Sequence, residues 1–342
     1  MNLLVCGGAG FIGSHFVRLA LKSGIAERVA VYDAFTYAGN KNNFHDFKDD
    51  PRFSSHGGWI QDRQRVAEVI QKEGITHMVN FAAESHNDRS LLEAGTFIDT
   101  NITGVQVLLE AAREFKLERY LQVSTDEVYG TTDEGQFTEE SPLLPNTPYS
   151  AAKAGGDLQV RAYVKAFGLP ALVTRGGNTY GPYHYPEKLI PFFVTRLIDG
   201  KKVPLYGEGL QVREWIHAED HAAGIMHVLQ NGSDGEIYNV GDDNERTNIA
   251  VVRILLDELG LGEDLIKRIP DPRGGAHDKR YSMTTTKLNA LGWEPVKPFE
   301  QSLRETVRWY VDNEWWWRPI LADAGYQGFI RQFYGGTLGE DL

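Results

Sequence analysis

The chain of 342 residues is long enough for about two domains, and its 42% hydrophobic content is sufficient for a folded core. Its formal net charge of −12 argues against nucleic acid and against an anionic membrane as partners. Its one cysteine, Cys6, cannot form an internal disulfide, which fits a reducing compartment. No apolar run reaches membrane-spanning length, and a strand begins too near the N-terminus for a signal peptide, so a cytoplasmic location is expected.

The first predicted element is a buried strand at residues 3–6 that runs directly into a glycine-rich loop. Gly7, Gly10 and Gly13 have the spacing of a loop whose backbone approaches a pyrophosphate at the start of a helix. A second strand, at 29–33, ends in Asp33, where a carboxylate would bind the adenosine ribose. Because Asp33 would repel a ribose phosphate, the sequence predicts NAD as cofactor in preference to NADP.

Strands and helices then alternate along the chain, which is typical of a right-handed, doubly wound parallel sheet of the Rossmann type. The expected strands are 76–81, 120–124 and 172–174, and the expected long helices are 103–115 and 150–167. Ligands should lie at the carboxyl ends of the strands, where the glycine loop and the segments 82–86 and 124–127 fall.

Two groups of side chains point to catalysis. Tyr149 and Lys153 form a Y-x-x-x-K pattern, in which the lysine charge favours the phenolate and lets the tyrosine take a proton from a hydroxyl. Asp126 and Glu127 follow a strand and add a second acid/base couple, which alcohol oxidation alone does not require. The sequence therefore indicates oxidation followed by a further step.

From about residue 181 the chain changes to Pro- and Gly-rich loops with scattered Arg and aromatic residues. We expect residues 1–180, with a return segment near 214–245, to form the NAD-binding domain. Residues 181–213 and 246–342 should form a smaller, discontinuous α/β lobe that binds the substrate.

The motifs resemble those of the nucleoside-diphosphate-glucose 4,6-dehydratases, a family of extended short-chain dehydrogenase/reductases. The resemblance extends from residue 1 to about residue 318 and rests on the glycine loop, the Y-x-x-x-K pair and four further segments: 82–90, 124–130, 180–191 and 277–281. The chain departs from the family's usual residues at Trp59, Thr179 and Gly275-Ala276.

The resemblance implies that NAD oxidises carbon 4 of a nucleoside-diphosphate glucose, with dTDP-glucose as the expected substrate. Tyr149 takes the proton of the 4-hydroxyl, and Thr125 hydrogen-bonds to that oxygen. Glu127 then removes the carbon 5 proton, and Asp126 protonates the departing 6-hydroxyl. Reduction at carbon 6, with reprotonation of carbon 5, yields a 4-keto-6-deoxy sugar and restores NAD.

The same resemblance implies the residues around each ligand. The predicted catalytic residues are Thr125, Asp126, Glu127, Tyr149 and Lys153. The predicted NAD contacts are Gly7, Gly10, Phe11, Ile12, Gly13, Asp33, Thr36, Ile60, Phe81, Ala82, Ala83, Ser85, Thr100, Tyr149 and Lys153. The predicted contacts of the nucleotide sugar are Ser85, Thr125, Asn178, Glu187, Lys188, Leu189, Pro204, Tyr206, Arg213, Asn248, Arg273 and His277.

Two other functions stay open at this point. A nucleotide-sugar 4-epimerase or dehydrogenase would keep Tyr149 and Lys153 but would not need Asp126 and Glu127. A non-catalytic NAD-binding sensor should have lost one member of the Tyr149–Lys153 pair. No metal is expected, although His217 and His221 are four residues apart.

We also expect a homodimer built on the two long helices. The first carries an apolar stripe at helical spacing: Val105, Leu108, Leu109 and Ala112. The second carries another: Val160, Tyr163, Val164 and Phe167. The alternative is that both stripes face only the sheet. Trp315-Trp316-Trp317 is interpreted as packing of a C-terminal element.

Overall fold

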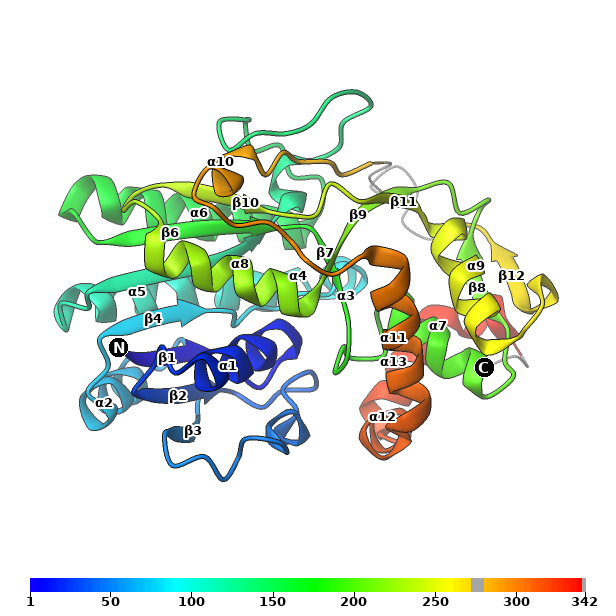
Figure 1. Ribbon diagram of the computed structural model, residues 1–342, viewed down its shortest axis with the longest axis horizontal. Coiled ribbons are helices and arrows are strands. Elements are labelled where there is room, and N and C mark those ends of the chain that lie inside the picture. Colours follow the sequence, from blue (N-terminus) through cyan, green and yellow to red (C-terminus); the bar gives the residue numbers. More distant parts are fainter. Residues whose placement is uncertain (272–279, 340–342) are drawn as a thin grey trace.

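The computed structural model describes residues 1–271 and 280–339 and confirms the predicted doubly wound α/β fold. Seven strands, all parallel, form the main sheet in the order β10-β6-β5-β4-β1-β2-β3 (Figure 1). They are β1 (Asn2–Cys6), β2 (Arg28–Asp33), β3 (Phe53–Gly57), β4 (His77–Asn80), β5 (Arg119–Thr125), β6 (Ala171–Gly176) and β10 (Ile237–Val240).

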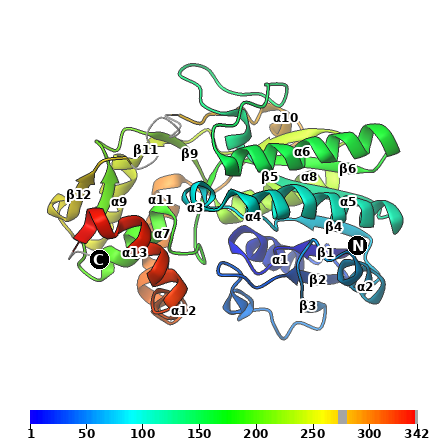
Figure 2. The ribbon, with the colours of Figure 1, turned by 180° about the vertical axis from the view of Figure 1, so that it is seen from behind.

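Helices cover both faces of this sheet, as the nearly continuous apolar strands require. One face carries α1 (Phe11–Ser23) and α8 (Ala218–Asn231), which pack against each other in front of the sheet in Figure 1. The other face carries α2 (Arg63–Glu73), α5 (Val105–Glu114) and α6 (Pro148–Phe167), which are in front in Figure 2. Each set of helices shares a hydrophobic cluster with its own face of the sheet.

Each strand expected from the sequence is present, but several elements of the main sheet and of the helices that cover it were not predicted individually, among them β3, α2, α8 and β10. β3 is an edge strand next to β2, and its sequence Phe-Ser-Ser-His-Gly contains no apolar run that would identify a strand. β10 pairs with β6 more than 60 residues later in the chain, so its place in the sheet is a result of tertiary pairing.

Short helical elements lie in the connections that follow the carboxyl ends of the strands. The helix expected at 103–115 is continuous with a preceding π-helix, η2 (Asp99–Gly104). The other short elements are η1 (Lys41–Phe44), α3 (Asn87–Leu92), α4 (Ala94–Ile98) and η3 (Asp126–Tyr129).

Most of the chain after β6 forms a second layer with its own hydrophobic cluster. Its strands form a three-stranded sheet, β7 (Asn178–Tyr180), β9 (Val212–His217) and β11 (Glu245–Thr247), and a parallel pair, β8 (Val203–Tyr206) and β12 (Ile266–Ile269). Its helical elements are α7 (Leu189–Ile198), α9 (Asn248–Leu259), η4 (Glu263–Leu265), α11 (Phe299–Asp312), α12 (Glu314–Leu321) and α13 (Ala324–Leu338). The short helix α10 (Thr286–Asn289) instead packs beside β10, and its Leu288 belongs to the hydrophobic cluster of the main sheet. Between these segments, α8 and β10 return to the main sheet (Figure 1).

The apolar stripe expected on the first long helix does not lie on the surface of the molecule. Val105, Leu108, Leu109 and Ala112 are all at most 1% exposed and pack into the core between α5 and the sheet. The prediction that this stripe forms a dimer face is therefore wrong, because a crossover helix must bury one face against its own sheet. On the second helix, Val160 and Tyr163 are buried in the same cluster, whereas Phe167 is exposed.

The tryptophan run packs as predicted at two of its three positions. Trp316 and Trp317 are buried in the hydrophobic cluster of the second layer. The indole nitrogen of Trp316 donates to Asn43 Oδ1, and that of Trp317 donates to the Tyr310 carbonyl. Trp315 is about half exposed. In the described part of the chain, no helix combines the length and apolar character that a membrane crossing requires.

Candidate active site

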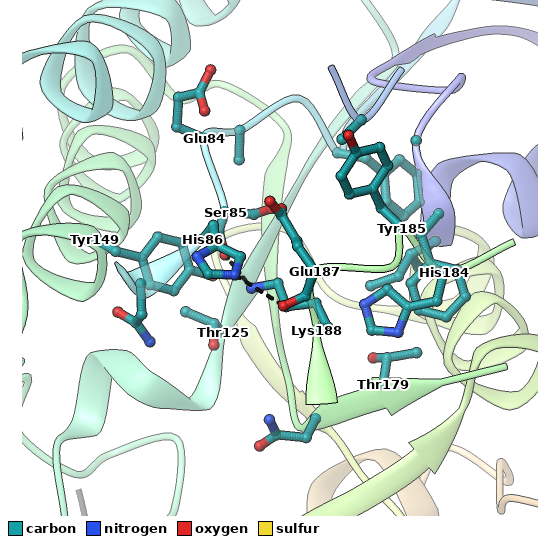
Figure 3. Close-up of a pocket in the computed structure, with 18 of the residues that line it drawn as sticks. Glu84, Ser85, His86, Thr125, Tyr149, Thr179, His184, Tyr185, Glu187 and Lys188 are labelled. Atoms are coloured by element: carbon teal, nitrogen blue, oxygen red, sulfur yellow. Dashed lines mark hydrogen bonds between the residues drawn. The ribbon is translucent and has the colours of Figure 1, made fainter. Parts of the chain in front are cut away.

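A cavity of about 410 Å³ lies where the strand order of the main sheet reverses, between β1 and β4, and extends into the second layer. This is the position at which open α/β sheets bind ligands. Every predicted site residue that the structure describes lines this cavity. Arg273 and His277 lie outside the described residues. Figure 3 shows Tyr149 and Thr125 on one side of the cavity, with His184 and Tyr185 on the other.

The glycine loop after β1 is fitted closely to the neighbouring strand. Gly7 has a φ of +74°, and a Cβ there would lie 2.4 Å from the backbone nitrogen of Ala82. A Cβ on Gly13 would lie 2.4 Å from the carbonyl oxygen of Gly7. Only glycine permits this path, which presents the backbone at the start of α1 to the cavity and so fits a pyrophosphate.

Asp33 ends β2 and is buried beside this loop. Its two carboxylate oxygens accept hydrogen bonds from the backbone nitrogens of Ala9 and Phe35, at 2.9 and 2.8 Å. Burial raises the pKa of Asp33, and these two hydrogen bonds counteract the shift. A fixed carboxylate that lines the cavity at this point suits the two hydroxyls of an adenosine ribose.

Tyr149 and Lys153 come from the first two turns of α6 and are buried. The Lys153 ammonium donates to the carbonyl of Val123 at 2.7 Å, and burial lowers the pKa of Lys153 to about 8. Burial and the nearby Glu127 raise the pKa of Tyr149, whereas a hydrogen bond with Thr125 acts in the opposite direction. In the protein alone, burial and the carboxylates thus outweigh the hydrogen bond with Thr125, and the net shift in the pKa of Tyr149 is upward. A cationic nicotinamide ring in the cavity would favour the phenolate.

The two carboxyl groups that follow β5 have different surroundings. Asp126 is 3% exposed, and burial together with the charges of Glu127 and Glu214 raises its pKa well above the usual range. One Asp126 oxygen accepts from the Thr125 hydroxyl at 3.1 Å, while the other has no hydrogen-bond partner among the described residues. These surroundings favour the protonated form of Asp126, which suits a group that donates a proton into the cavity.

Glu127 is held as an acceptor. The side-chain amide of Asn87, at the start of α3, donates to one carboxylate oxygen, and the Tyr281 hydroxyl donates to the same oxygen at 3.4 Å. Asn87 Oδ1 in turn accepts from the hydroxyl of Thr147, the residue that caps α6. Asn87 was not among the predicted site residues, although it lies within the segment 82–90 that carries the family resemblance.

The wall opposite β5 is formed by the loop before α7. The Lys188 ammonium donates to the Ser85 carbonyl at 2.7 Å, and a ring nitrogen of His86 is 3.3 Å from the Glu187 carbonyl (Figure 3). The Glu187 carboxylate is paired with the guanidinium of Arg89 at 3.0 Å. These contacts join the loop after β4 to the second layer.

Several buried polar atoms face the cavity without a hydrogen-bond partner in the described part of the chain. They include Asn178 Oδ1, Asn248 Oδ1, His184 Nδ1 and Trp215 Nε1. Unpaired buried polar groups are costly, so each is a position at which a bound ligand would supply the missing partner. His184 also stacks on Phe11 of the glycine loop, with ring centroids 4.1 Å apart.

The structure shows the contacts of two of the residues that depart from the family pattern, Thr179 and Trp59. The Thr179 hydroxyl lies 2.7 Å from His221 Nδ1, so the hydroxyl and the ring form a buried hydrogen bond. Trp59 lines the cavity but is 53% exposed, and its carbonyl accepts from the Tyr32 hydroxyl at 2.8 Å. Gly275-Ala276 lies outside the described residues.

The doubly wound sheet, the glycine loop with its acid, and the buried Tyr149–Lys153 pair define the class of extended short-chain dehydrogenase/reductases. Within that class, the model of the GDP-mannose 4,6 dehydratase family matches residues 4–306. The chain belongs to this family.

Curated relatives and solved structures agree with this family assignment. A dTDP-glucose 4,6-dehydratase of Streptomyces niveus is 46% identical over 94% of this chain and 96% of its own. The crystal structure of DesIV, a dTDP-glucose 4,6-dehydratase of Streptomyces venezuelae with NAD bound, is 48% identical over 94% of this chain and 100% of its own, with a TM-score of 0.91. A UDP-glucose 4-epimerase of Thermus thermophilus, also in complex with NAD, is more distant: 28% identical over 92% of this chain and all of its own, with a TM-score of 0.84.

Proposed function

We propose that this protein is an NAD-dependent hydro-lyase that converts dTDP-glucose into the 4-keto-6-deoxy sugar. The observation that carries the proposal is the pair of carboxyl groups beside Tyr149. Asp126 is buried with a raised pKa, whereas Glu127 is held as an acceptor by Asn87 and Tyr281. Two carboxyl groups with opposite properties suit elimination of water, which requires one acid and one base.

The chain's own residues then act in sequence. Tyr149, hydrogen-bonded to Thr125, takes the proton of the 4-hydroxyl. Oxidation at carbon 4 acidifies the hydrogen at carbon 5, and Glu127 removes it. Asp126 donates its proton to the departing 6-hydroxyl. NAD, when bound, supplies the oxidation at carbon 4 and the later reduction at carbon 6, and carbon 5 regains a proton as carbon 6 is reduced.

The residues that would hold NAD are those of the glycine loop, Asp33, Thr100, Tyr149 and Lys153. Asp33 supports NAD over NADP, because its carboxylate would repel a ribose phosphate. Competitive titration of cofactor-free protein with the two cofactors measures this preference, and tighter binding of NADP would contradict it.

We propose further that residues 1–180, with a return near 214–245, bind NAD, and that 181–213 and 246–342 bind the nucleotide sugar. Lys188 and Arg213 support this division, because both line the part of the cavity in the second layer and both are cations suited to a pyrophosphate. Asn248, Pro204 and Tyr206, from the same segments, also line the cavity.

A 4-epimerase of the same class is the second candidate, supported by the shared fold and the shared Tyr149–Lys153 pair. It would have no use for the buried acid Asp126. Incubating the protein with dTDP-, UDP-, CDP- and GDP-glucose and following mass loss separates the candidates. Loss of one water from dTDP-glucose is expected, and a product of unchanged mass would favour the epimerase.

We also propose a homodimer formed through the outer surface of α3, α4 and α6. Exposed apolar side chains on these three helices support it: Leu91, Leu92, Ile98 and Leu158 are each 46–55% exposed. The three helices contact one another on one side of the sheet (Figure 2). Water contact with these side chains is unfavourable, so burying them against a second copy would stabilise the pair.

A further inference from the structure

A buried ion pair lies next to Lys153, on the side of α6 that faces the sheet. The Asp157 carboxylate on α6 accepts from the Arg175 guanidinium on β6 at 3.0 Å, and both side chains are 3% exposed. Neither residue lines the cavity, so neither can contact a ligand directly. Because a buried ion pair is costly to desolvate and adds little stability over an apolar pair, its presence here needs a reason other than stability.

Asp157 and Lys153 share one face of α6. They are four residues apart, so their side chains lie next to each other on the helix. That face packs on β5 and β6, which run beside α6 in Figure 2. The Lys153 ammonium donates to the Val123 carbonyl on β5 at 2.7 Å, whereas Asp157 is bonded to the neighbouring strand, β6.

Asp157 is held in place through the other contacts of its partner. Arg175 Nη1 donates to the Tyr129 hydroxyl at 2.9 Å, and the guanidinium carbon is 4.8 Å from the centroid of the Tyr129 ring. The Tyr129 hydroxyl donates to Asn239 Oδ1 on β10 at 2.7 Å. Arg175, Tyr129 and Asn239 are all at most 3% exposed. The carboxylate therefore belongs to a fixed network that joins α6, β6, β10 and η3.

The charge of Lys153 depends on this carboxylate. Burial lowers the pKa of Lys153 to about 8, and the charge of Asp157 acts against that shift. Other titratable groups face this region from each packed element: Tyr120 on β5, Arg175 on β6, Asp126, Glu127 and Tyr129 on η3, and Tyr149 on α6 itself. Burial raises the pKa of Tyr120 and of Tyr129, so both are uncharged near neutral pH. Without Asp157, Lys153 and Arg175 would be two buried cations that have lost their shared carboxylate.

We infer that Asp157 is a positioning residue for the proton transfer at carbon 4, and that it keeps the Lys153 ammonium charged and in place against β5. The inference rests on the proposed function in one respect, the role of Lys153 beside Tyr149. A charged ammonium favours the phenolate form of Tyr149, which takes the proton of the 4-hydroxyl. Asp157 acts only through Lys153, because it does not reach the cavity.

Asp157→Asn should let Lys153 lose its proton at lower pH. NMR of cofactor-free protein labelled with ¹³C at the lysine Cε follows this ionisation, and a Lys153→Arg variant assigns the signal. The wild-type signal should titrate near the pKa of about 8. The Asp157→Asn signal should titrate about one pH unit lower, as loss of one nearby opposite charge does. Asp157→Glu retains the charge and should titrate as the wild type does; an unchanged midpoint in Asp157→Asn would overturn the inference.

A second variant keeps the test decisive if Asp157→Asn does not fold, because that change leaves the buried Arg175 charge unpaired. The double variant Asp157→Asn/Arg175→Gln removes both charges of the ion pair. Its Lys153 signal should still titrate below that of the wild type, because the charge of Asp157 is the one that acts on Lys153. A wild-type midpoint in the double variant would also overturn the inference.

Single-turnover kinetics test the consequence for the first step. In a Glu127→Gln background, formation of reduced nicotinamide from dTDP-glucose reports oxidation at carbon 4. The ratio of the rate with Asp157→Asn to the rate without it should fall about tenfold as the pH rises from about 6 to about 9, because Lys153 loses its proton earlier. A ratio that does not change with pH would show a merely structural role and refute the inference.

Tyr129→Phe is the matched control. It removes a buried hydrogen bond from the same guanidinium but leaves the Asp157 carboxylate in place. Its rate ratio should not change with pH, and its Lys153 signal should titrate as in the wild type. Equal pH-dependent losses in Tyr129→Phe and Asp157→Asn would show that any damage to the network has this effect, and would overturn the role of the carboxylate.

The two measurements separate this inference from the proposed function. If the wild type releases no water from dTDP-glucose while Asp157→Asn shifts the Lys153 titration, the dehydration is refuted and the action of Asp157 on Lys153 stands. If the wild type dehydrates dTDP-glucose and the Lys153 titration does not move, only the role of Asp157 is refuted.

Discussion

Asp126 and Glu127 are adjacent in the sequence, but the structure gives them opposite chemical properties. Asp126 points into a buried region where the charges of Glu127 and Glu214 disfavour its ionised form. Glu127 is partly exposed and accepts hydrogen bonds from Asn87 and Tyr281. The division into acid and base is thus a consequence of position and not of residue type.

Glu127→Gln should separate oxidation from elimination. The carboxamide is not basic, so the carbon 5 proton should stay in place while Tyr149 still allows oxidation at carbon 4. Loss of one general base lowers a rate by about 10²–10⁴-fold. Reduced-nicotinamide absorbance should therefore accumulate after mixing with dTDP-glucose.

Tyr149→Phe is the paired control, because it removes the group needed for the first step. It should show no reduced-nicotinamide absorbance. Normal turnover by Glu127→Gln, or accumulation in Tyr149→Phe, would refute this division of labour.

Glu214, on β9, makes stability depend on pH. It is 1% exposed, and burial raises its pKa from 4.5 to about 7. Because the folded state binds this proton more tightly than the unfolded state, the contribution is favourable at low pH and is lost as pH rises from about 4.5 through 7. The side chain of Gln cannot ionise, so the Glu214→Gln variant should not lose this contribution. Between pH 4.5 and pH 8, the free energy of unfolding of the wild type should therefore fall relative to that of the variant by up to about 3 kcal/mol.

Urea titrations of both proteins across this range measure the difference. The variant can still be less stable at pH 4.5, because a carboxamide has only one acceptor oxygen for the backbone nitrogens of Asp242 and Met283 that Glu214 satisfies. A difference between the two proteins that does not change with pH would show that Glu214 keeps an ordinary pKa.

At the scale of the element, α6 combines folding and catalysis. Its first residues form a capping box: the Thr147 hydroxyl accepts from the Ser150 nitrogen, and the Ser150 hydroxyl accepts from the Thr147 nitrogen, both at 3.1 Å. Thr147 also donates to Asn87, which holds Glu127. The same cap therefore fixes the helix that carries Tyr149 and the amide that orients the base.

Thr147→Ala should lower the free energy of unfolding by about 1 kcal/mol, the usual cost of a lost N-cap. It should also slow elimination, because Asn87 loses the hydrogen bond that orients it. Thr147→Ser retains the hydroxyl and should restore most of both. Denaturant unfolding measures the loss of stability, and the rate of product formation measures the effect on elimination. Equal behaviour of the Ala and Ser variants would show that the hydroxyl has neither role.

For the whole molecule, the question is which surface meets a second copy. The buried stripe on α5 cannot, but Leu158 on α6 is 55% exposed. Leu158→Glu would place a charge in an apolar contact and should reduce the mass from light scattering from twice 38.4 kDa to that of one chain. Val296→Glu alters a more exposed apolar side chain, in the loop before α11, and should leave the mass unchanged. A monomeric wild type at micromolar concentration would refute the dimer.

The sequence by itself determined the elements and motifs whose signal is local. Apolar runs identified β1, β2, β4, β5 and β6, and fixed spacings identified the glycine loop, Asp33 and the Tyr149–Lys153 pair. Such features can be predicted from the sequence because their physical cause acts over a few residues. The cause is either the burial of a strand on both faces or a backbone path that only glycine allows.

Only the tertiary structure decided the features that depend on distant partners. It placed β10 beside β6, buried the stripe on α5, raised the pKa of Asp126 through burial and the charges of Glu127 and Glu214, and stacked His184 on Phe11. Burial, charge neighbourhood and stacking each join residues tens to hundreds of positions apart. A periodic pattern on one helix shows that a face is apolar, but only packing shows what covers it.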